Sequence, residues 1–251
     1  MSARVRLGLT ACLATLVGLV IYLQGTAPSV VEADTGELQT IAAIGGLPHP
    51  TGYPVFVLFG RLFTLLPFGE PAYRVNVMSG VFGAVALGLM VVLLRTIGLS
   101  LRGAFAGALL YGFTYTLWDS ALRAGTYTIA VCIAILGLWR TIVAFRSGRP
   151  RDLALAAFLL GLMVTGHMSF LLPVATLGLA LAGRALVARQ RVVASLVLLA
   201  GAFALGLTPF LYVLWADGRS YPMNYLRLVD TVFDPAGLHN PYLTTPIKRL
   251  A

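Results

Sequence analysis

Long apolar segments recur along this chain, and they constrain its fold more than any other feature. A helix needs about 20 apolar residues to cross a bilayer, within a range of about 17–25. Segments of this kind are found at 5–23, 75–97, 102–118, 125–145, 152–166, 168–187 and 192–215. Because 59% of all residues are hydrophobic and only 11% are charged, we predict an all-α, polytopic transmembrane bundle of about seven spans, with short helices in its first extracytoplasmic loop.

Three of the apolar stretches need individual interpretation. The first follows Arg4 and Arg6 as in a signal peptide, but no small-residue cleavage site precedes Gln24, so we interpret it as an uncleaved span. His167 alone separates the sixth segment from the short fifth one, which predicts a tight helical hairpin. The run 53–68 contains Arg61 and fits an amphipathic helix lying in the membrane interface.

The distribution of charge predicts the orientation. With a cytoplasmic N-terminus, Asp152 is the only acid on the inner side. The inner arginines are Arg4, Arg6, Arg95, Arg102, Arg140, Arg146, Arg149, Arg151, Arg184, Arg189 and Arg191. This asymmetry follows the positive-inside rule and accounts for the net charge of +9, so no nucleic-acid partner is predicted. We expect an integral, multi-pass protein of the bacterial inner membrane.

The same orientation divides the chain into parts. Residues 1–215 form the predicted bundle, and its loop 24–74 lies on the extracytoplasmic side together with 119–124 and His167. The polar tail 216–251 lies there too and is expected to be a truncated segment. Cys12 and Cys132 fall within apolar segments, so no disulfide or metal site is predicted from them.

The stretch 32–54 is the polar island of this chain. Asp34 and Glu37 precede a short apolar-periodic segment, which is typical of a capping box in which Glu37 reaches back to the helix start. A carboxylate there can also take a proton from an acceptor hydroxyl. Farther on, His49 and Tyr53 belong to a stiff turn, HPTGYP, built from prolines and a glycine.

Several side chains at outer span ends have two interpretations. Arg74 is either a snorkelling anchor or a clamp for phosphate, and Arg123 and His167 share this ambiguity. Tyr127 fits an interfacial belt aromatic. The sequence contains no Walker loop, GxGxxG after a strand, HExxH or GxSxG motif, and no His or Cys cluster has metal-ligand spacing.

Two blocks of sequence resemble the signature of one family. They are DTGEL at 34–38 and GGLPHPTGYPVFVLFGRLFTLLPFGEPAYRVNVMSGVFGA at 45–84. The family is the protein O-mannosyltransferase-like group of multi-spanning proteins, within the GT-C class of glycosyltransferases. The resemblance covers 32–84 with little interruption and continues more weakly to about Val213 through Tyr127 and His167.

The resemblance implies a GT-C-like bundle that transfers a mannose-like sugar from a polyprenyl-phosphate carrier, outside the cytoplasm and with inversion. The matching general base is Asp34, with Glu37 as its partner. Arg74 and His167 would stabilise the leaving phosphate, and His49 with Tyr53 would form the pocket floor. Asn76 and Tyr127 complete the implied substrate-binding set. The partners are membrane lipid, the lipid-linked sugar, and a protein, lipid or glycan acceptor. One acid pair leaves open whether a divalent cation takes part.

The sequence also departs from the family pattern and leaves rival functions open. Thr35 and Thr51 are mild changes, but Gly125 stands where the family carries Glu, in the GTYT segment. That loss and the expected truncation fit a catalytically inactive scaffold as an alternative. A transporter or lipid flippase is the other alternative, although such proteins carry ionisable groups at mid-membrane depth, where Arg61 is the only clear candidate.

Overall fold

The computed structural model describes residues 1–187 and 192–225, and these residues form helices and no strand. The helices are α1 Ala3–Gly25, α2 Asp34–Ile44, α3 Pro54–Thr64, α4 Pro71–Thr96, α5 Leu101–Gly112, α6 Tyr115–Leu122, α7 Tyr127–Ser147, α8 Pro150–Gly166, the 3₁₀ turn η1 Met168–Phe170, α9 Leu171–Val187, α10 Val192–Gly206 and α11 Phe210–Asp217. The predicted all-α class is confirmed.

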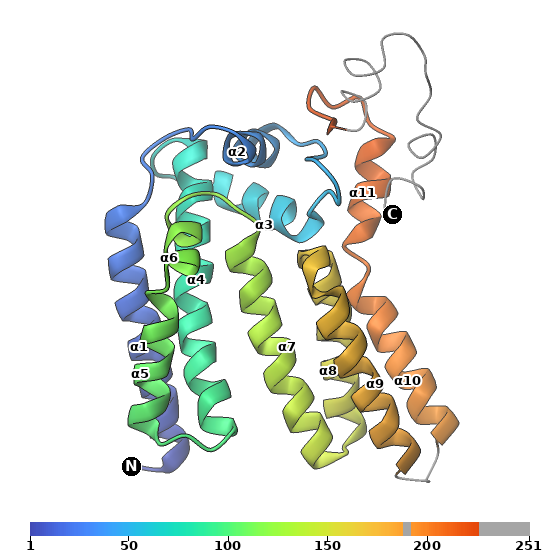
Figure 1. Ribbon diagram of the computed structural model, residues 1–251. Coiled ribbons are helices and arrows are strands. Elements are labelled where there is room, and N and C mark those ends of the chain that lie inside the picture. The colour runs from blue at the N-terminus through green and yellow to red at the C-terminus, as the bar shows by residue number, and fades with distance from the viewer. Residues whose placement is uncertain (188–191, 226–251) are drawn as a thin grey trace.

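The long helices stand side by side, and α2 and α3 lie across one end of them (Figure 1). Helix α4 packs against α1, α5 and α7, while α8 packs against α7, α9 and α10. Glycine allows two of these close approaches, since a Cβ at Gly88 would overlap Thr15 of α1 and a Cβ at Gly161 would overlap the Phe203 carbonyl of α10.

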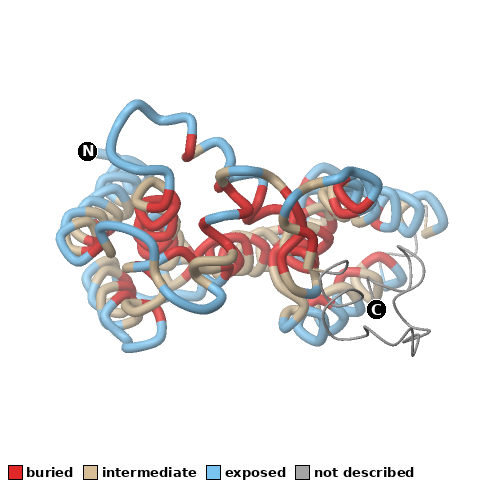
Figure 2. The backbone as a smooth tube through the Cα atoms, turned by 90° about the horizontal axis from the view of Figure 1, so that it is seen from above, coloured by how far each residue is buried: buried red, intermediate tan, exposed pale blue. Residues whose placement is uncertain are grey.

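Burial follows the same arrangement. Seen from above, buried backbone runs through the middle of the bundle and exposed backbone lies at its flanks (Figure 2). Helices α1, α9 and α10 present large exposed apolar side chains, among them Leu9, Leu13, Leu172, Leu179 and Val197. An apolar outer surface of this extent is typical of helices that face lipid, so the chain is an integral membrane protein.

Fewer helices qualify as spans by length and composition than the predicted seven. Within the described residues, four helices are long and apolar enough to cross a membrane, namely α1, α4, α7 and η1 with α9, and the bent pair α10 and α11 makes up to five. Helix α3 has 11 residues, so it is too short to span, as its predicted interfacial role requires. The hairpin turn at His167 between α8 and η1 is confirmed.

The predicted span 102–118 is wrong as one continuous helix. It is divided into α5 and α6 at Phe113 and Thr114. The Tyr22 hydroxyl donates to the carbonyl of Gly112 at 2.7 Å, which satisfies a carbonyl at the end of α5 that has no helical partner. Thr114 then bonds back to the Tyr111 carbonyl at 2.8 Å.

The loops that the predicted alternation of spans assigns to the extracytoplasmic side lie together at one end of the bundle. The ribbon places α2, α3 and the segment after α6 at the end opposite the N-terminus (Figure 1). The start of the tail is tied to this layer, because the Leu47 amide donates to Met223 at 3.1 Å and the Tyr225 amide donates to Leu47 at 2.9 Å. Most of the predicted tail domain, 226–251, lies outside the described residues.

Candidate active site

Asp34 opens helix α2, but it does not cap it. The preceding Ala33 has φ 58° and ψ −141°, and no side chain makes a cap hydrogen bond there. The predicted capping box is therefore wrong. Asp34 is exposed and makes no hydrogen bond or ion pair to another described residue, so its carboxylate is available at the positive end of the helix dipole.

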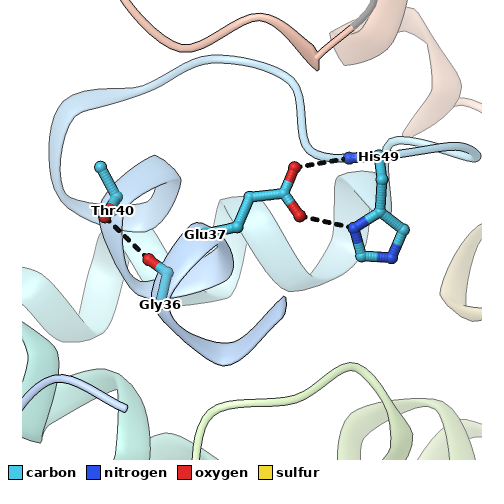
Figure 3. A network of polar contacts seen from close by, with 4 residues as sticks. All are labelled: Gly36, Glu37, Thr40 and His49. Carbon is cyan, nitrogen blue, oxygen red and sulfur yellow. Dashed lines mark hydrogen bonds and ion pairs between the residues drawn. The ribbon is translucent and has the colours of Figure 1, made fainter. Parts of the chain in front are cut away.

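Glu37 bonds to His49 and not to the start of helix α2. Its Oε1 accepts the backbone N–H of His49 at 2.8 Å, and its Oε2 lies 2.5 Å from Nδ1 of the ring (Figure 3). Their side chains are only 16% and 24% exposed, so this two-point contact fixes the imidazole. With Nδ1–H directed at the carboxylate, Nε2 of His49 is left on the opposite side of the ring, away from Glu37 (Figure 3).

The predicted stiff turn around His49 is present. The Gly52 amide donates to the His49 carbonyl at 3.0 Å, and Gly52 has φ 83°, a left-handed value that glycine adopts freely. Tyr53 also has a positive φ, 36°, and Pro54 then begins α3 at a helix position that suits proline. The turn therefore directs both His49 and Tyr53 at the same face.

His167 joins this face from the hairpin between α8 and η1. Its ring stacks on Tyr53 at 5.6 Å and on Tyr127 at 5.1 Å between ring centroids, each with an interplanar angle of 29°. His49 meets Tyr53 edge-on at 5.1 Å. The four rings form a continuous aromatic wall, which places Tyr127 against His167 rather than only in an interfacial belt.

The surroundings of His167 favour the neutral form of its imidazole. Burial lowers the pKa of its imidazole below the usual 6.5, and the neighbouring His49 lowers it further. Nδ1 accepts the Ser169 backbone N–H at 3.2 Å, so the proton resides on Nε2. The predicted contact of His167 with the leaving phosphate would therefore use a neutral N–H donor.

A cavity of about 330 Å³ connects these groups. Five of the eight predicted site residues line it: Asp34, His49, Tyr53, Tyr127 and His167. Glu37 lies behind His49 and supports it. The wall also includes Glu32, Asp119, Ser120 and Arg123, which the site prediction did not include.

Arg74 lies outside this cavity, and its predicted role as a phosphate clamp is wrong. Nε donates to the carbonyl of Phe68 at 2.5 Å, Nη1 to Thr64 at 2.6 Å and Nη2 to Gly69 at 2.7 Å. The guanidinium therefore holds the turn that follows α3. Carbonyls at the end of a helix lack intrahelical donors, which explains why an arginine is placed here.

Asn76 is fully buried and does not reach the cavity, so it is not a substrate contact as predicted. Its Oδ1 accepts from Gln39 Nε2 at 2.7 Å and from the Ala124 amide at 2.8 Å. Its Nδ2 donates to the carbonyls of Ala27 at 2.8 Å and Ser29 at 3.0 Å. Asn76 thus ties helix α2 and the loop before it to the segment that carries Ala124 and Gly125.

Arg123 is the basic group that the cavity does contain. It is the only arginine or lysine among the described residues of the cavity wall. Its Nη2 lies 2.5 Å from Oδ2 of Asp119, and the two side chains are 47% and 37% exposed. An exposed pair of this kind is weak, so an incoming anion can compete for the guanidinium. Its predicted place at an outer span end, with the same two interpretations as Arg74, was the signal available in the sequence.

Gly125 leaves room in the same wall. A Cβ built there meets only the Arg123 carbonyl, at 4.0 Å, so a larger side chain would project without collision. Its amide donates to Ser79 Oγ at 3.3 Å, which fixes the backbone. The departure from the family pattern at Gly125 therefore changes the surface of the cavity and not the course of the chain.

The folded loop also brings together a group able to hold a metal ion. Within the described part of the chain, one ligand atom from each of Asp34, Glu37 and His49 lies within 4.8 Å of the others. Two carboxylates and one imidazole suit a divalent cation such as Mn²⁺, Mg²⁺ or Zn²⁺. Sequence spacing did not reveal this group because His49 belongs to the loop after α2, and a cation would have to displace part of the Glu37–His49 contact.

Comparison with known proteins relates the chain to one family. A sequence model of that family, described as "Protein O-mannosyl-transferase TMEM260 N-terminal domain", matches residues 34–190. Mouse protein O-mannosyl-transferase TMEM260 is 30% identical over 191 residues, which are 74% of this chain and 27% of the mouse protein. The Dictyostelium discoideum protein of the same name is 28% identical over 132 residues, 49% of this chain and 16% of that protein. The chain thus spans about a quarter or less of these relatives, and no solved structure matches it.

Proposed function

Because the chain belongs to the protein O-mannosyl-transferase TMEM260 N-terminal domain family, we propose that it carries the donor-binding and base-bearing part of a membrane glycosyltransferase. The reaction moves a mannose-like sugar from a polyprenyl-phosphate carrier to a hydroxyl group. The relatives' name favours a protein hydroxyl over a lipid or glycan acceptor. The observation that carries the proposal is one cavity that contains an unengaged carboxylate, Asp34, and a displaceable guanidinium, Arg123.

Asp34 acts as the general base in this proposal. The acceptor hydroxyl gives its proton to the carboxylate while its oxygen forms a bond to the anomeric carbon. The bond from that carbon to the phosphate oxygen breaks, and its electron pair leaves with the phosphate. Because attack and departure occur on opposite faces, the anomeric configuration inverts. Glu37 takes no proton in this scheme; it keeps the His49 ring in place.

Arg123 replaces Arg74 as the group that binds the leaving phosphate. The cavity wall already holds the carboxyl groups of Glu32, Asp34 and Asp119, so a phosphate needs positive charge beside it. A guanidinium suits this role because it presents several donors in a planar fork. His167 adds a neutral Nε2–H donor, and the aromatic wall of Tyr53 and Tyr127 bounds the sugar's side of the cavity.

A divalent cation held by Asp34, Glu37 and His49 would also supply the positive charge that a phosphate needs in this cavity. When bound, it would neutralise the phosphate as a Lewis acid. Glu37, His49 and one oxygen of Asp34 would hold it in place of part of the Glu37–His49 contact, and the second Asp34 oxygen would remain for the acceptor's proton.

We further propose that the cavity faces the extracytoplasmic side and that the opposite, arginine-rich end faces the cytoplasm. The residues before and after each span alternate between these ends in the structure (Figure 1). The domain division into a bundle over 1–215 and an extracytoplasmic tail from 216 belongs to this proposal, as does placement in a bacterial inner membrane.

The test is a transfer assay with the full-length protein, polyprenyl-phosphate mannose and a serine- or threonine-containing peptide. The proposal predicts a glycopeptide whose anomeric configuration, read by NMR, is opposite to that of the donor. Movement of the lipid-linked sugar across vesicles without a glycopeptide would favour a flippase. Donor binding without turnover would favour an inactive scaffold, for which the open space at Gly125 is the specific observation.

A further inference from the structure

A second cavity, of about 310 Å³, lies at the end of the bundle opposite the candidate active site. Three arginines and three apolar residues line it, and most of its lining surface is apolar: Ala3, Arg4, Arg6, Leu7, Arg95 and Leu101. The ribbon shows why these residues meet, because the start of α1, the end of α4 and the start of α5 share this end (Figure 1). None of them has a role in the proposed transfer reaction.

The three arginines that line this cavity have no acidic partner among the described residues. Within 1–187 and 192–225, ion pairs join Glu37 to His49, Asp119 to Arg123 and Asp152 to Arg140, and none involves Arg4, Arg6 or Arg95. Asp152 is also bonded to Ser147 at 2.8 Å, so this acid is already satisfied.

Arg95 is held in place at the rim of this cavity. Its Nη1 donates to the Leu99 carbonyl at 2.8 Å, which keeps the guanidinium beside the α4–α5 connection. Like charges gathered around one cavity repel one another, and an anion bound between them removes that repulsion. The first turn of α1 adds backbone N–H groups without helical acceptors and the positive end of its dipole.

The remaining lining residues indicate which kind of anion fits. Leu7 and Leu101 give the cavity an apolar side, and α1 and α4 are both long and apolar enough to span a membrane. A ligand that combines a phosphate with hydrocarbon at the membrane surface matches this surface. Anionic phospholipids have that chemistry, and basic residues at the membrane surface attract them.

We propose that this arginine-lined cavity binds the headgroup of an anionic phospholipid. Arg4, Arg6 and Arg95 contact the phosphate, and Leu7 and Leu101 contact the upper part of its acyl chains. The bound lipid bridges α1 and α4, two helices that pack directly against each other. The proposal is independent of the transfer reaction, since the two cavities share no residue.

The test is native mass spectrometry of the whole chain in detergent with added phosphatidylglycerol or phosphatidylcholine. Wild type is compared with the triple variant Arg4→Gln, Arg6→Gln, Arg95→Gln. The matched control changes three exposed arginines outside the cavity, Arg102→Gln, Arg149→Gln and Arg151→Gln. At about 1 kcal/mol for each basic residue, the cavity variant should bind phosphatidylglycerol roughly a hundredfold more weakly. The control should bind it like wild type.

Several results would overturn the proposal. Equal losses in both variants would mean that only overall charge attracts the lipid. Equal binding of phosphatidylcholine would remove the anion preference, and displacement by inorganic phosphate at equal concentration would assign the cavity to a free anion. If the triple variant loses helicity by circular dichroism, the double variant Arg4→Gln, Arg6→Gln replaces it, since Arg95 then keeps its bond to Leu99. Unchanged phosphatidylglycerol binding by a folded double variant would also contradict the proposal.

Discussion

Replacing Asn76 with Ala should destabilise the protein more than any other single polar substitution near the cavity. Asn76 is fully buried and makes hydrogen bonds with Gln39, Ala124, Ala27 and Ser29, at 2.7 to 3.0 Å. The variant leaves the Ala124 amide without this acceptor and deprives Gln39 of its shortest contact. A buried donor or acceptor left unsatisfied costs about 1–3 kcal/mol. The expected loss in the free energy of unfolding is therefore about 3–5 kcal/mol.

The measurement is thermal unfolding of the purified protein in detergent, followed by circular dichroism. For a chain of this size, about 1 kcal/mol corresponds to a shift of about 2–4 °C, so the melting temperature should fall by roughly 10 °C. Gln24→Ala, which removes an exposed amide, is the control and should leave the melting temperature unchanged. A fall of less than about 3 °C in the Asn76 variant would refute the reasoning that this amide holds the cavity wall.

Three further predictions concern charge in the cavity. Because the pKa of His167 is lowered in the folded protein, the unfolded state takes up a proton first as pH falls. The stabilising contribution of His167 should be fully present above about pH 6.5 and decrease below it. If the melting temperature of His167→Gln falls with pH as steeply as that of wild type, this prediction is contradicted. Arg123→Gln should weaken binding of polyprenyl phosphate about tenfold with little change in melting temperature. Arg74→Gln should lower the melting temperature and leave binding by the folded protein unchanged. The reverse pattern would identify Arg74 as the phosphate ligand. Mn²⁺ should bind the chelator-treated protein, seen as a change in the electron paramagnetic resonance spectrum of Mn²⁺, and His49→Gln should weaken that binding. Equal Mn²⁺ binding by the variant would show that His49 is not a ligand.

The parts of the fold that the sequence predicts are those governed by local apolar length. Helices α1, α4, α7 and α9 follow the predicted segments because a span needs a long apolar run and little else. At the break between α5 and α6, the Gly112 carbonyl accepts a hydrogen bond from Tyr22, which lies 90 residues away in the sequence. No pattern within the segment 102–118 contains that information.

In the candidate site, too, the sequence predicts position along the bundle but not the partners of the side chains. The alternation of spans brings Asp34, His49, Tyr127 and His167 to one end, and the resemblance selects among them. Side-chain partners are a different matter. Glu37 could bond to its own helix or to His49, and only the path of the 45–53 turn brings the imidazole within reach.

Arg74 illustrates the remaining difficulty. Its position at the outer end of a span suits a phosphate clamp, but each of its three nitrogens donates to a carbonyl, at Thr64, Phe68 or Gly69. Those carbonyls are free because α3 ends there, which is a property of the fold rather than of the residue. Arg123 has the same charge, lines the cavity and has an exposed partner, and for these reasons we propose it as the phosphate ligand.

The most direct test of the central claim is single-turnover transfer by the Asp34→Asn variant of the full-length protein, with donor binding measured on the same sample. If Asp34 is the general base, sugar transfer to the peptide should fall about 10²- to 10⁴-fold while the affinity for polyprenyl-phosphate mannose changes little. Glu32→Gln, an exposed carboxylate in the same cavity wall, should transfer at the wild-type rate. Wild-type transfer by the Asp34 variant would contradict the account and remove Asp34 as the base.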